Sequence, residues 1–171
     1  MKIAISGKSG CGNTSCSRLV ADRLGIKFIN YTFRNMAEEK GLKLEELAIL
    51  AQKDDSYDIF VDEKQKEFAS EGNCVVGSRL AIWLIEDADL KVFLTAPVEI
   101  RAERIHKREG GSYEEVLQKT IERDRKDTER FKHIYNIDNN NYSHADIIID
   151  TILYPPEWIA DAIVERAKLM L

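Results

Sequence analysis

The chain of 171 residues is poor in cysteine and proline, and it lacks a long apolar run. Its three cysteines, Cys11, Cys16 and Cys74, fit neither a zinc-ligand spacing nor a disulfide framework, so we expect reduced thiols. Only three prolines occur, which leaves little sign of a domain boundary. No segment approaches the length of a membrane span, and residues 1–6 are too short for a secretory signal. These absences predict a single-domain cytoplasmic protein without a membrane partner.

An excess of positive charge is also absent. Lysine and arginine number 25 against 30 aspartates and glutamates, which gives a net charge of −5. Proteins that bind nucleic-acid backbones are usually basic, so we expect no nucleic-acid partner unless a local basic patch exists. With 44% hydrophobic and 32% charged residues, the composition is typical of a soluble globular domain. We expect a monomer or a small homo-oligomer.

Apolar runs alternate with helical patterns along the whole chain. The runs predict five strands, at residues 2–6, 26–30, 73–77, 90–95 and 145–150. Helical patterns run from the glycine cluster to about residue 24 and over residues 32–70, with a break near 54–56, and others begin at Pro97, at a Ser112–Glu115 capping box and at Pro155 or Pro156. Continuous apolar strands separated by helices predict an α/β fold, with a five-stranded parallel sheet covered on both faces.

A glycine-rich segment lies between the first predicted strand and the first helix. Glycines let backbone N–H groups turn inward around an anion, and a helix N-terminus adds positive potential there. The Thr14 hydroxyl suits a Mg²⁺ ion. We therefore predict a phosphate-binding loop for a nucleotide, made of Gly7, Lys8, Ser9, Gly10, Cys11, Gly12, Asn13, Thr14 and Ser15. The alternative is a glycine-rich turn that binds nothing.

Asn13 departs from the standard phosphate loop, which has lysine at this position. That lysine normally neutralises the β and γ phosphates of the nucleotide. Lys8 stands one residue after Gly7, where deviant loops carry a lysine that reaches the nucleotide. We predict that Lys8 replaces part of the missing charge and is a catalytic residue.

Three arginines, Arg101, Arg104 and Arg108, are spaced to share one face of a helix. Gly110 and Gly111 follow directly and suit a hinge. Phosphoryl transfer needs cations at the transferring group, and this pattern resembles the lid of small kinases. We predict a lid at residues 104–115 with Arg104 and Arg108 as catalytic residues. The alternative, equally consistent for Arg101, is a solvated face paired with neighbouring glutamates.

Arg123, Asp127 and Arg130 form a second set on one helical face. Two arginines that flank a carboxylate can bind a phosphate and an exocyclic amine together. The spacing is equally consistent with an intrahelical salt-bridge ladder, because residues 122–130 are almost all charged.

Arg34 and Arg79 follow the second and third predicted strands, at the edge where open parallel sheets bind ligands. Either arginine could instead decorate the surface. Asp58, Asp62 and Gln65 lie on a helical stretch and are interpreted as a solvated face, with contact to a second substrate as the alternative.

Segments along nearly the whole chain match one family pattern: YTFR at 31–34, EGNCVV at 71–76, SRLA at 78–81, ADLK at 88–91, AP at 96–97, RAERI at 101–105, RE at 108–109, RF at 130–131 and IYNID at 134–138. Together with the glycine-rich loop they resemble the cytidylate kinases, particularly the short archaeal-type form of these P-loop nucleoside monophosphate kinases.

The resemblance implies that the chain transfers the γ-phosphoryl group of ATP, with Mg²⁺, to CMP or dCMP. It implies a single kinase domain over residues 1–171, in which residues 31–70 bind the monophosphate. The CMP-binding residues are then Arg34, Asp58, Arg79, Arg123, Asp127 and Arg130.

Two positions depart from the family pattern. Asn13 replaces the loop lysine, and Gly77 stands where relatives have an acidic residue. They leave open a nucleotide-binding protein with weak turnover or none, and a kinase for another small acceptor is a third interpretation.

Overall fold

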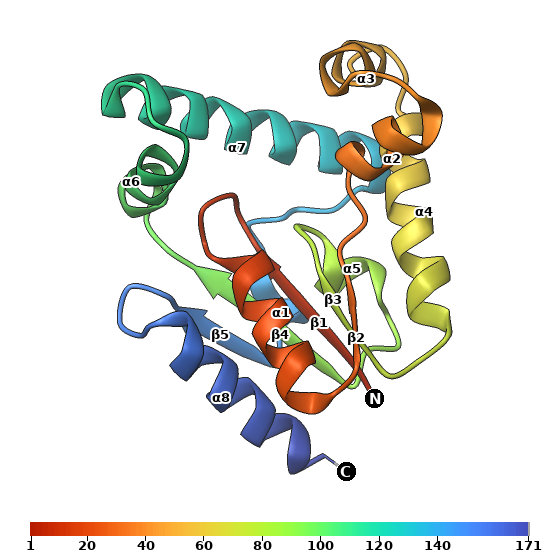
Figure 1. Ribbon diagram of the computed structural model, residues 1–171, viewed down its shortest axis with the longest axis vertical. Helices are drawn as coiled ribbons and strands as arrows, with labels where there is room; N and C mark the ends of the chain where they lie inside the picture. The colour runs from red at the N-terminus through yellow and green to blue at the C-terminus, as the bar shows by residue number, and fades with distance from the viewer. Residues whose placement is uncertain (171) are drawn as a thin grey trace.

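The computed structural model describes residues 1–170, which are built around one five-stranded sheet (Figure 1). The strands are β1 (Lys2–Gly7), β2 (Lys27–Ile29), β3 (Cys74–Gly77), β4 (Leu90–Thr95) and β5 (Ile147–Asp150). They lie in the order β2-β3-β1-β4-β5, and every neighbouring pair is parallel. The predicted α/β fold with five parallel strands is confirmed.

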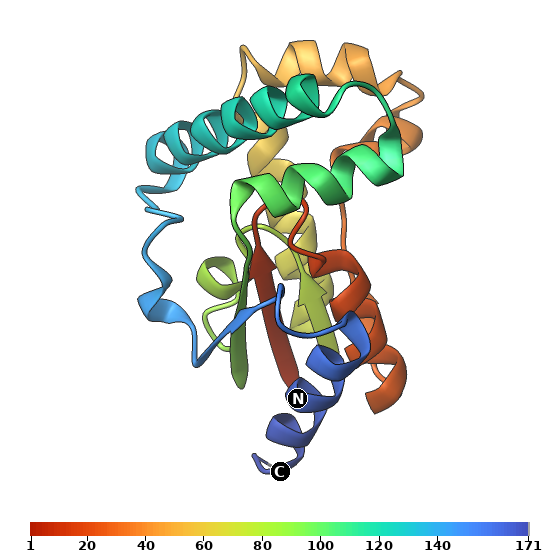
Figure 2. The same cartoon turned by 90° about the vertical axis from the view of Figure 1, so that its left-hand side faces the viewer.

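Helices cover both faces of the sheet (Figures 1 and 2). On one face, α1 (Asn13–Leu24) and α8 (Pro156–Lys168) pack against strand residues such as Ile3 and Ile5. On the other face, Ala4 packs with residues of α5 (Ala81–Leu84) and of the end of α4 (Ser56–Ser70). Residues 3–5 of β1 thus alternate between two cores, which is why this stretch is apolar at every position.

A smaller apolar core holds three helices beside the sheet. Tyr31, Met36, Leu47 and Val61 are buried together there. They join α2 (Phe33–Lys40) and α3 (Leu44–Ala51) to α4. The break predicted near residues 54–56 is confirmed, because α3 ends at Ala51 and α4 begins at Ser56. The binding role predicted for residues 31–70 stays a prediction.

Two helices, α6 (Val98–Glu109) and α7 (Tyr113–Tyr135), lie above the carboxyl ends of the strands (Figures 1 and 2). The chain returns from α7 through the short 3-10 helix η1 (Tyr142–His144) to β5. Both termini lie at the opposite end of the molecule (Figure 1). The carboxyl ends of the strands therefore face α6 and α7.

Two predicted helix starts are wrong in detail. Pro97 has extended backbone (ψ 150°) and caps α6 instead of being its first residue. Ser112 caps α7, but its hydroxyl donates to the Glu114 carboxylate at 3.1 Å, so the capping box with Glu115 does not form. Within residues 1–170, no helix is both long and apolar enough to cross a membrane.

Candidate active site

The glycine-rich loop connects β1 to α1 and packs tightly against α6. The Cys11 N–H donates to the Lys8 carbonyl at 3.0 Å, which closes the turn. Gly10 has φ +86°, and a Cβ built on it would lie 2.8 Å from the Cβ of Arg101. Only glycine fits this backbone and this contact. The loop thus has the strand–loop–helix setting that phosphate binding requires.

Asn13, Ser17 and Gly77 form one packed unit behind the loop. The buried Ser17 hydroxyl donates to Asn13 Oδ1 at 2.9 Å, which leaves the amide N–H₂ group facing away from Ser17. A Cβ on Gly77 would lie 2.6 Å from Ser17 Oγ. An acidic side chain at position 77 would therefore require Ser17, and with it Asn13, to move. The two departures from the family pattern are structurally linked.

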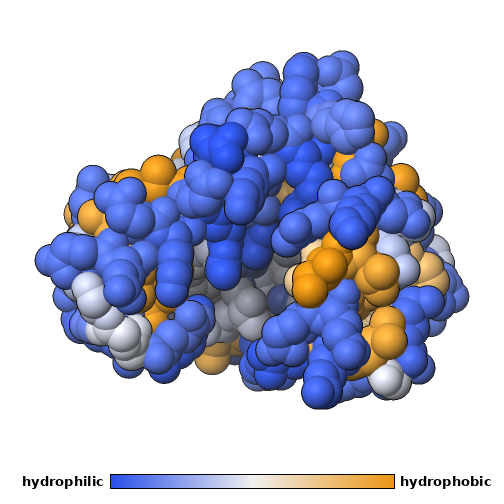
Figure 3. All heavy atoms as spheres, turned by 90° about the horizontal axis from the view of Figure 1, so that it is seen from above, coloured by the Kyte–Doolittle hydropathy of each residue, from blue (hydrophilic) through white to orange (hydrophobic). Residues whose placement is uncertain are grey.

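Two cationic side chains flank the tip of the loop. The Lys8 ammonium donates to Asn140 Oδ1 at 2.7 Å, and an Arg123 N–H donates to Ser9 Oγ at 3.1 Å. Lys8 also lines a cavity of about 10 Å³, which is room for roughly one water molecule. Seen from above, hydrophilic residues dominate this end of the molecule, and the surface is hollowed near its centre (Figure 3).

The buried Arg101 side chain connects the loop to α7 through hydrogen bonds. It is 3% exposed and donates to the carbonyls of Ser9 at 3.0 Å and Ala96 at 3.1 Å. Its other N–H groups donate to both carboxylate oxygens of Asp124, at 3.2 and 2.5 Å. The solvated face considered for Arg101 is therefore wrong. Asp124 was missed, because no sequence spacing links it to a residue 23 positions earlier.

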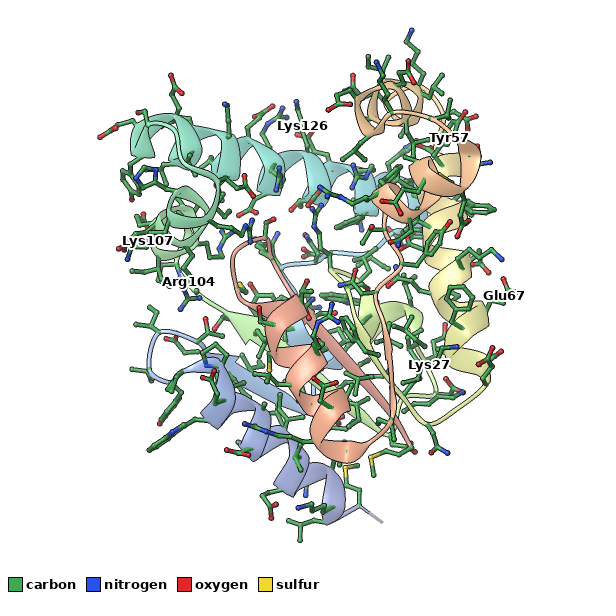
Figure 4. All side chains as sticks on the ribbon, in the orientation of Figure 1. Lys27, Tyr57, Glu67, Arg104, Lys107 and Lys126 are labelled. Atoms are coloured by element: carbon green, nitrogen blue, oxygen red, sulfur yellow. The ribbon has the colours of Figure 1, made fainter. Side chains whose placement is uncertain are left out.

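Arg104 and Arg108 occupy different surroundings. Arg104 donates to the Gly10 carbonyl at 3.3 Å and to the Thr151 hydroxyl and carbonyl at 2.8 and 2.9 Å. It extends from α6 towards the β5–α8 connection (Figure 4). The Arg108 side chain is 63% exposed and pairs with Glu109, as the surface interpretation expected. The structure thus brings Arg104, but not Arg108, to the loop.

Four charged residues from three parts of the chain meet between α4 and α7. Asp127 accepts hydrogen bonds from Arg79 at 2.5 Å and from Arg130 at 3.0 Å. Arg130 Nε lies 3.1 Å from Asp58 Oδ1. We call Asp58, Arg79, Asp127 and Arg130 the acceptor cluster. It is more than an intrahelical ladder, and the structure separates it from Arg123, which contacts the loop.

The α4 stripe, made of Asp58, Asp62 and Gln65, faces the end of α7. Asp58 and Gln65 are 5% and 3% exposed, so their interpretation as a solvated face is wrong. The Tyr135 hydroxyl donates to Asp62 Oδ2 at 2.6 Å. Burial raises the pKa of Asp62 to about 6, and it also raises the pKa of Asp58 against the opposing effect of Arg130. A polar helix pattern cannot show that another helix covers it.

Arg34 and Thr14 remain exposed near the ends of β2 and β1. Arg34 lies in the first turn of α2, and no hydrogen bond or ion pair found within residues 1–170 joins it to the acceptor cluster. Thr14 and Ser15 lie in the first turn of α1. An Asn30 N–H donates to Thr14 Oγ1 at 3.3 Å, which leaves this oxygen accessible.

The oxygen donors at the loop fit a divalent cation that a nucleotide helps to hold. Mg²⁺ keeps several waters and needs only one or two protein oxygens beside substrate phosphates. The exposed Thr14 hydroxyl supplies one such oxygen. In the described part of the chain, His, Cys, Asp and Glu form no group of three able to hold a metal by themselves.

Comparison with known proteins identifies the family. Residues 2–152 match the cytidylate kinase-like family. The chain belongs to this family. It is 46% identical over 154 residues to cytidylate kinase 2 of Borrelia garinii subsp. bavariensis, which covers 88% of this chain and 86% of that protein. It is 43% identical over 167 residues to the cytidylate kinase of Pyrococcus horikoshii, covering 96% and 86%. The predicted resemblance is confirmed.

Solved kinase structures share the fold of this family member. Shikimate kinase from Acinetobacter baumannii in complex with shikimate aligns with a TM-score of 0.65 at 17% identity, covering 97% of this chain and 92% of that one. Deoxyadenosine kinase from M. mycoides with bound dATP aligns with a TM-score of 0.58 at 15% identity, covering 98% and 100%. The sheet and its glycine-rich loop thus have the P-loop kinase architecture.

Proposed function

We propose that this protein transfers the γ-phosphoryl group of ATP to CMP or dCMP, giving CDP or dCDP and ADP. One observation carries the proposal beyond family membership. Gly7 and Lys8 of the loop line the same small cavity as Arg79 and Asp127 of the acceptor cluster. A phosphate-binding loop and an acceptor site that face one cavity are the arrangement that direct transfer between two bound nucleotides needs.

The loop binds ATP in this proposal. Backbone N–H groups of residues 10–14 and the N-terminus of α1 hold the β phosphate. Lys8 supplies positive charge that Asn13 cannot. The Thr14 hydroxyl holds Mg²⁺, which neutralises phosphate charge when bound. The ATP-binding residues are Gly7, Lys8, Ser9, Gly10, Cys11, Gly12, Asn13, Thr14 and Ser15.

The acceptor cluster binds CMP. Each guanidinium has five N–H donors, so Arg79 and Arg130 can bind a phosphate while they hold Asp127. Arg34, Arg123 and Asp58 complete the CMP-binding set in this proposal. Catalysis rests on positioning and electrostatics, so the reaction demands no general base.

Residues 104–115 form the lid. Arg104 stabilises charge on the transferring group from its position beside Gly10, and Arg108 joins it when the lid closes over the nucleotides. The Arg108 side chain is 63% exposed in the structure, so this role requires the lid to move. We further propose that the protein acts in the cytoplasm on small molecules, as a monomer or small homo-oligomer without nucleic acid.

Production of ADP from ATP, measured separately with CMP, dCMP, UMP and AMP, tests the proposal. We expect turnover with CMP or dCMP. Turnover with AMP alone would overturn the assignment. Nucleotide binding without turnover by any acceptor would support a silent binding protein, which relatives named cytidylate kinases at 43–46% identity do not favour.

The role of Lys8 has its own test. Lys8→Ala should raise the KM for ATP and lower turnover, because the loop then lacks its only lysine. Lys168→Ala is the matched control, since Lys168 is 56% exposed and pairs with Glu165 at the end of α8, away from the loop. Unchanged ATP affinity and turnover in Lys8→Ala would remove Lys8 from the mechanism.

A further inference from the structure

Three consecutive asparagines, Asn139 to Asn141, lie between α7 and η1, and only the first of them is buried. The two exposed asparagines have evident partners. Asn140 Oδ1 accepts a hydrogen bond from the Lys8 ammonium at 2.7 Å. Asn141 caps η1, where its Oδ1 accepts from the Ser143 N–H at 3.1 Å. Asn139 is only 5% exposed, and asparagine is a residue that folded proteins mostly leave at the surface, so its burial needs an explanation.

The Asn139 amide has its oxygen bonded and its nitrogen free. The Thr128 hydroxyl of α7 donates to Asn139 Oδ1 at 2.9 Å, so the N–H₂ group points away from Thr128. Among residues 1–170, no acceptor is found for this N–H₂ group. The nitrogen keeps some accessible surface, unlike the unpartnered oxygens Asp58 Oδ2 and Gln65 Oε1, which are sealed. Asn139 therefore offers hydrogen-bond donors that a ligand atom can reach.

Asn139 lines the small cavity between the loop and the acceptor cluster. Gly7 and Lys8 line it from the loop, and Arg79 and Asp127 line it from the acceptor cluster. The cavity measures about 10 Å³, which is room for roughly one water-sized atom. A single phosphate oxygen has this size. Since a phosphoryl group that leaves the loop for the acceptor passes between the two sites, one of its oxygens is a suitable occupant.

The charges around the cavity favour an occupant that accepts hydrogen bonds. Lys8 and Arg79 are cationic, and an amide N–H₂ group only donates. Asp124 and Asp127 also line the cavity, but arginines already hold both carboxylates. A cation at position 139 would be attracted to those carboxylates, whereas the neutral Asn139 amide leaves its donors available to an anionic oxygen.

We propose that Asn139 donates a hydrogen bond to an oxygen of the γ-phosphoryl group of ATP, and that Thr128 is the positioning residue that turns the amide towards it. The inference rests on the proposed function and adds two residues to it. During transfer, charge is spread over the oxygens of the phosphoryl group, and a fixed donor stabilises it there. Asn140 binds Lys8, so one short turn places a neutral donor and a cation at the same group.

The test compares the β,γ-imido analogue of ATP with ADP, because ADP lacks the γ-phosphoryl group. Asn139→Leu keeps much of the volume and removes the donors. Calorimetry with Mg²⁺ should show about tenfold weaker binding of the analogue and unchanged binding of ADP, as for the loss of a hydrogen bond to a charged group. The kcat/KM for ATP should fall by at least the same factor. Thr128→Val should show the same pattern with a smaller loss, since the amide remains but can turn away.

Two matched variants separate the donor from the added charge. Asn139→Asp keeps the oxygen that Thr128 bonds and replaces the donor by a carboxylate oxygen, so it should weaken binding of the analogue more than Asn139→Leu does. Asn141→Asp is the control. It makes the same chemical change at an exposed position and keeps the oxygen that caps η1, so binding of both nucleotides should stay as in the wild type.

The ratio of the two affinities decides the inference, because a merely structural role would weaken ADP and the analogue alike. Equal weakening of both, or unchanged binding of both, in folded Asn139→Leu and Asn139→Asp would overturn it. Circular dichroism melts establish folding, and Thr128→Val decides by the same ratio if neither Asn139 variant folds. The binding experiment needs no acceptor. The expected ratios in a wild type that does not phosphorylate CMP or dCMP would therefore overturn only the proposed function, while a wild type that binds neither nucleotide would overturn both.

Discussion

The phosphate loop depends on main-chain groups, whereas the acceptor cluster depends on side chains. The loop is one contiguous segment whose shape depends on main-chain geometry, as at Gly10, where a Cβ would lie 2.8 Å from Arg101. The acceptor cluster consists of charged side chains from α4, the β3–α5 connection and α7. A main-chain site is rigid and insensitive to pH, whereas a site of buried carboxylates and arginines depends on ionisation.

Removing the Arg101 side chain, which connects the loop to α7 through hydrogen bonds, should have the largest effect on stability. Arg101→Met leaves Asp124 without its partner and frees the Ser9 carbonyl, since Arg101 bonds both. We expect a loss of about 3–5 kcal/mol, as for other broken buried ion pairs. Urea unfolding measures it. Arg125→Met is the control, because Arg125 pairs with Glu122 and Glu129 on the exposed side of α7. Similar losses of unfolding free energy in both variants would show that the connection through Arg101 does not stabilise the protein.

A change confined to the loop comes next. Gly10→Ala combines a positive φ with a contact of 2.8 Å to Arg101, so we expect a loss of about 2–4 kcal/mol and of ATP-dependent turnover. Gly12→Ala has a similar φ of +84° but no atom within 4 Å of the added Cβ, so it should lose only about 1–2 kcal/mol. Equal losses of unfolding free energy in Gly10→Ala and Gly12→Ala would mean that close packing of the loop against α6 does not contribute to stability.

The α4 stripe should make the stability of the protein depend on pH, whereas the loop should not. Burial raises the pKa of Asp62 from 3.8 to about 6, so the folded protein binds more protons than the unfolded chain between these values. Stability should therefore fall as pH rises through this window, by about 1–3 kcal/mol for this carboxyl. Asp58 acts in the same direction, because burial raises its pKa too.

Asp62→Asn isolates that contribution. The variant should lose much of the decline between pH 4 and 6, because the amide that replaces the carboxyl cannot ionise, while Gly12→Ala should keep it. Unfolding free energies at half-unit pH steps measure the difference. An unchanged pH profile in Asp62→Asn would place the ionisation elsewhere and weaken the contrast between the two regions.

The sequence predicts those features whose residues are adjacent in the chain. The loop, all five strands and the order of helices follow from local patterns, since a strand, a glycine turn and a helix start are adjacent in the chain. The pairing of Arg79 with Asp127, 48 positions away, follows only from the fold. The surroundings of Arg101 and Asp58 could not be predicted for the same reason, because their ionic partners, Asp124 and Arg130, are distant in sequence.

The smallest expected effect is at Asn13, which departs from the family pattern together with Gly77. Its side chain accepts one hydrogen bond from Ser17 and is partly exposed, so Asn13→Lys should change stability by no more than about 1 kcal/mol. Turnover should rise or stay similar, because a lysine here restores charge at the β and γ phosphates. A large loss of turnover in a folded variant would mean that the Asn13 amide, held by Ser17 beside Gly77, has a role of its own. Repeating the substitution in a Ser17→Ala background decides that point: if Ser17 positions the amide, Ser17→Ala alone should already lower turnover, and Asn13→Lys should then restore part of it.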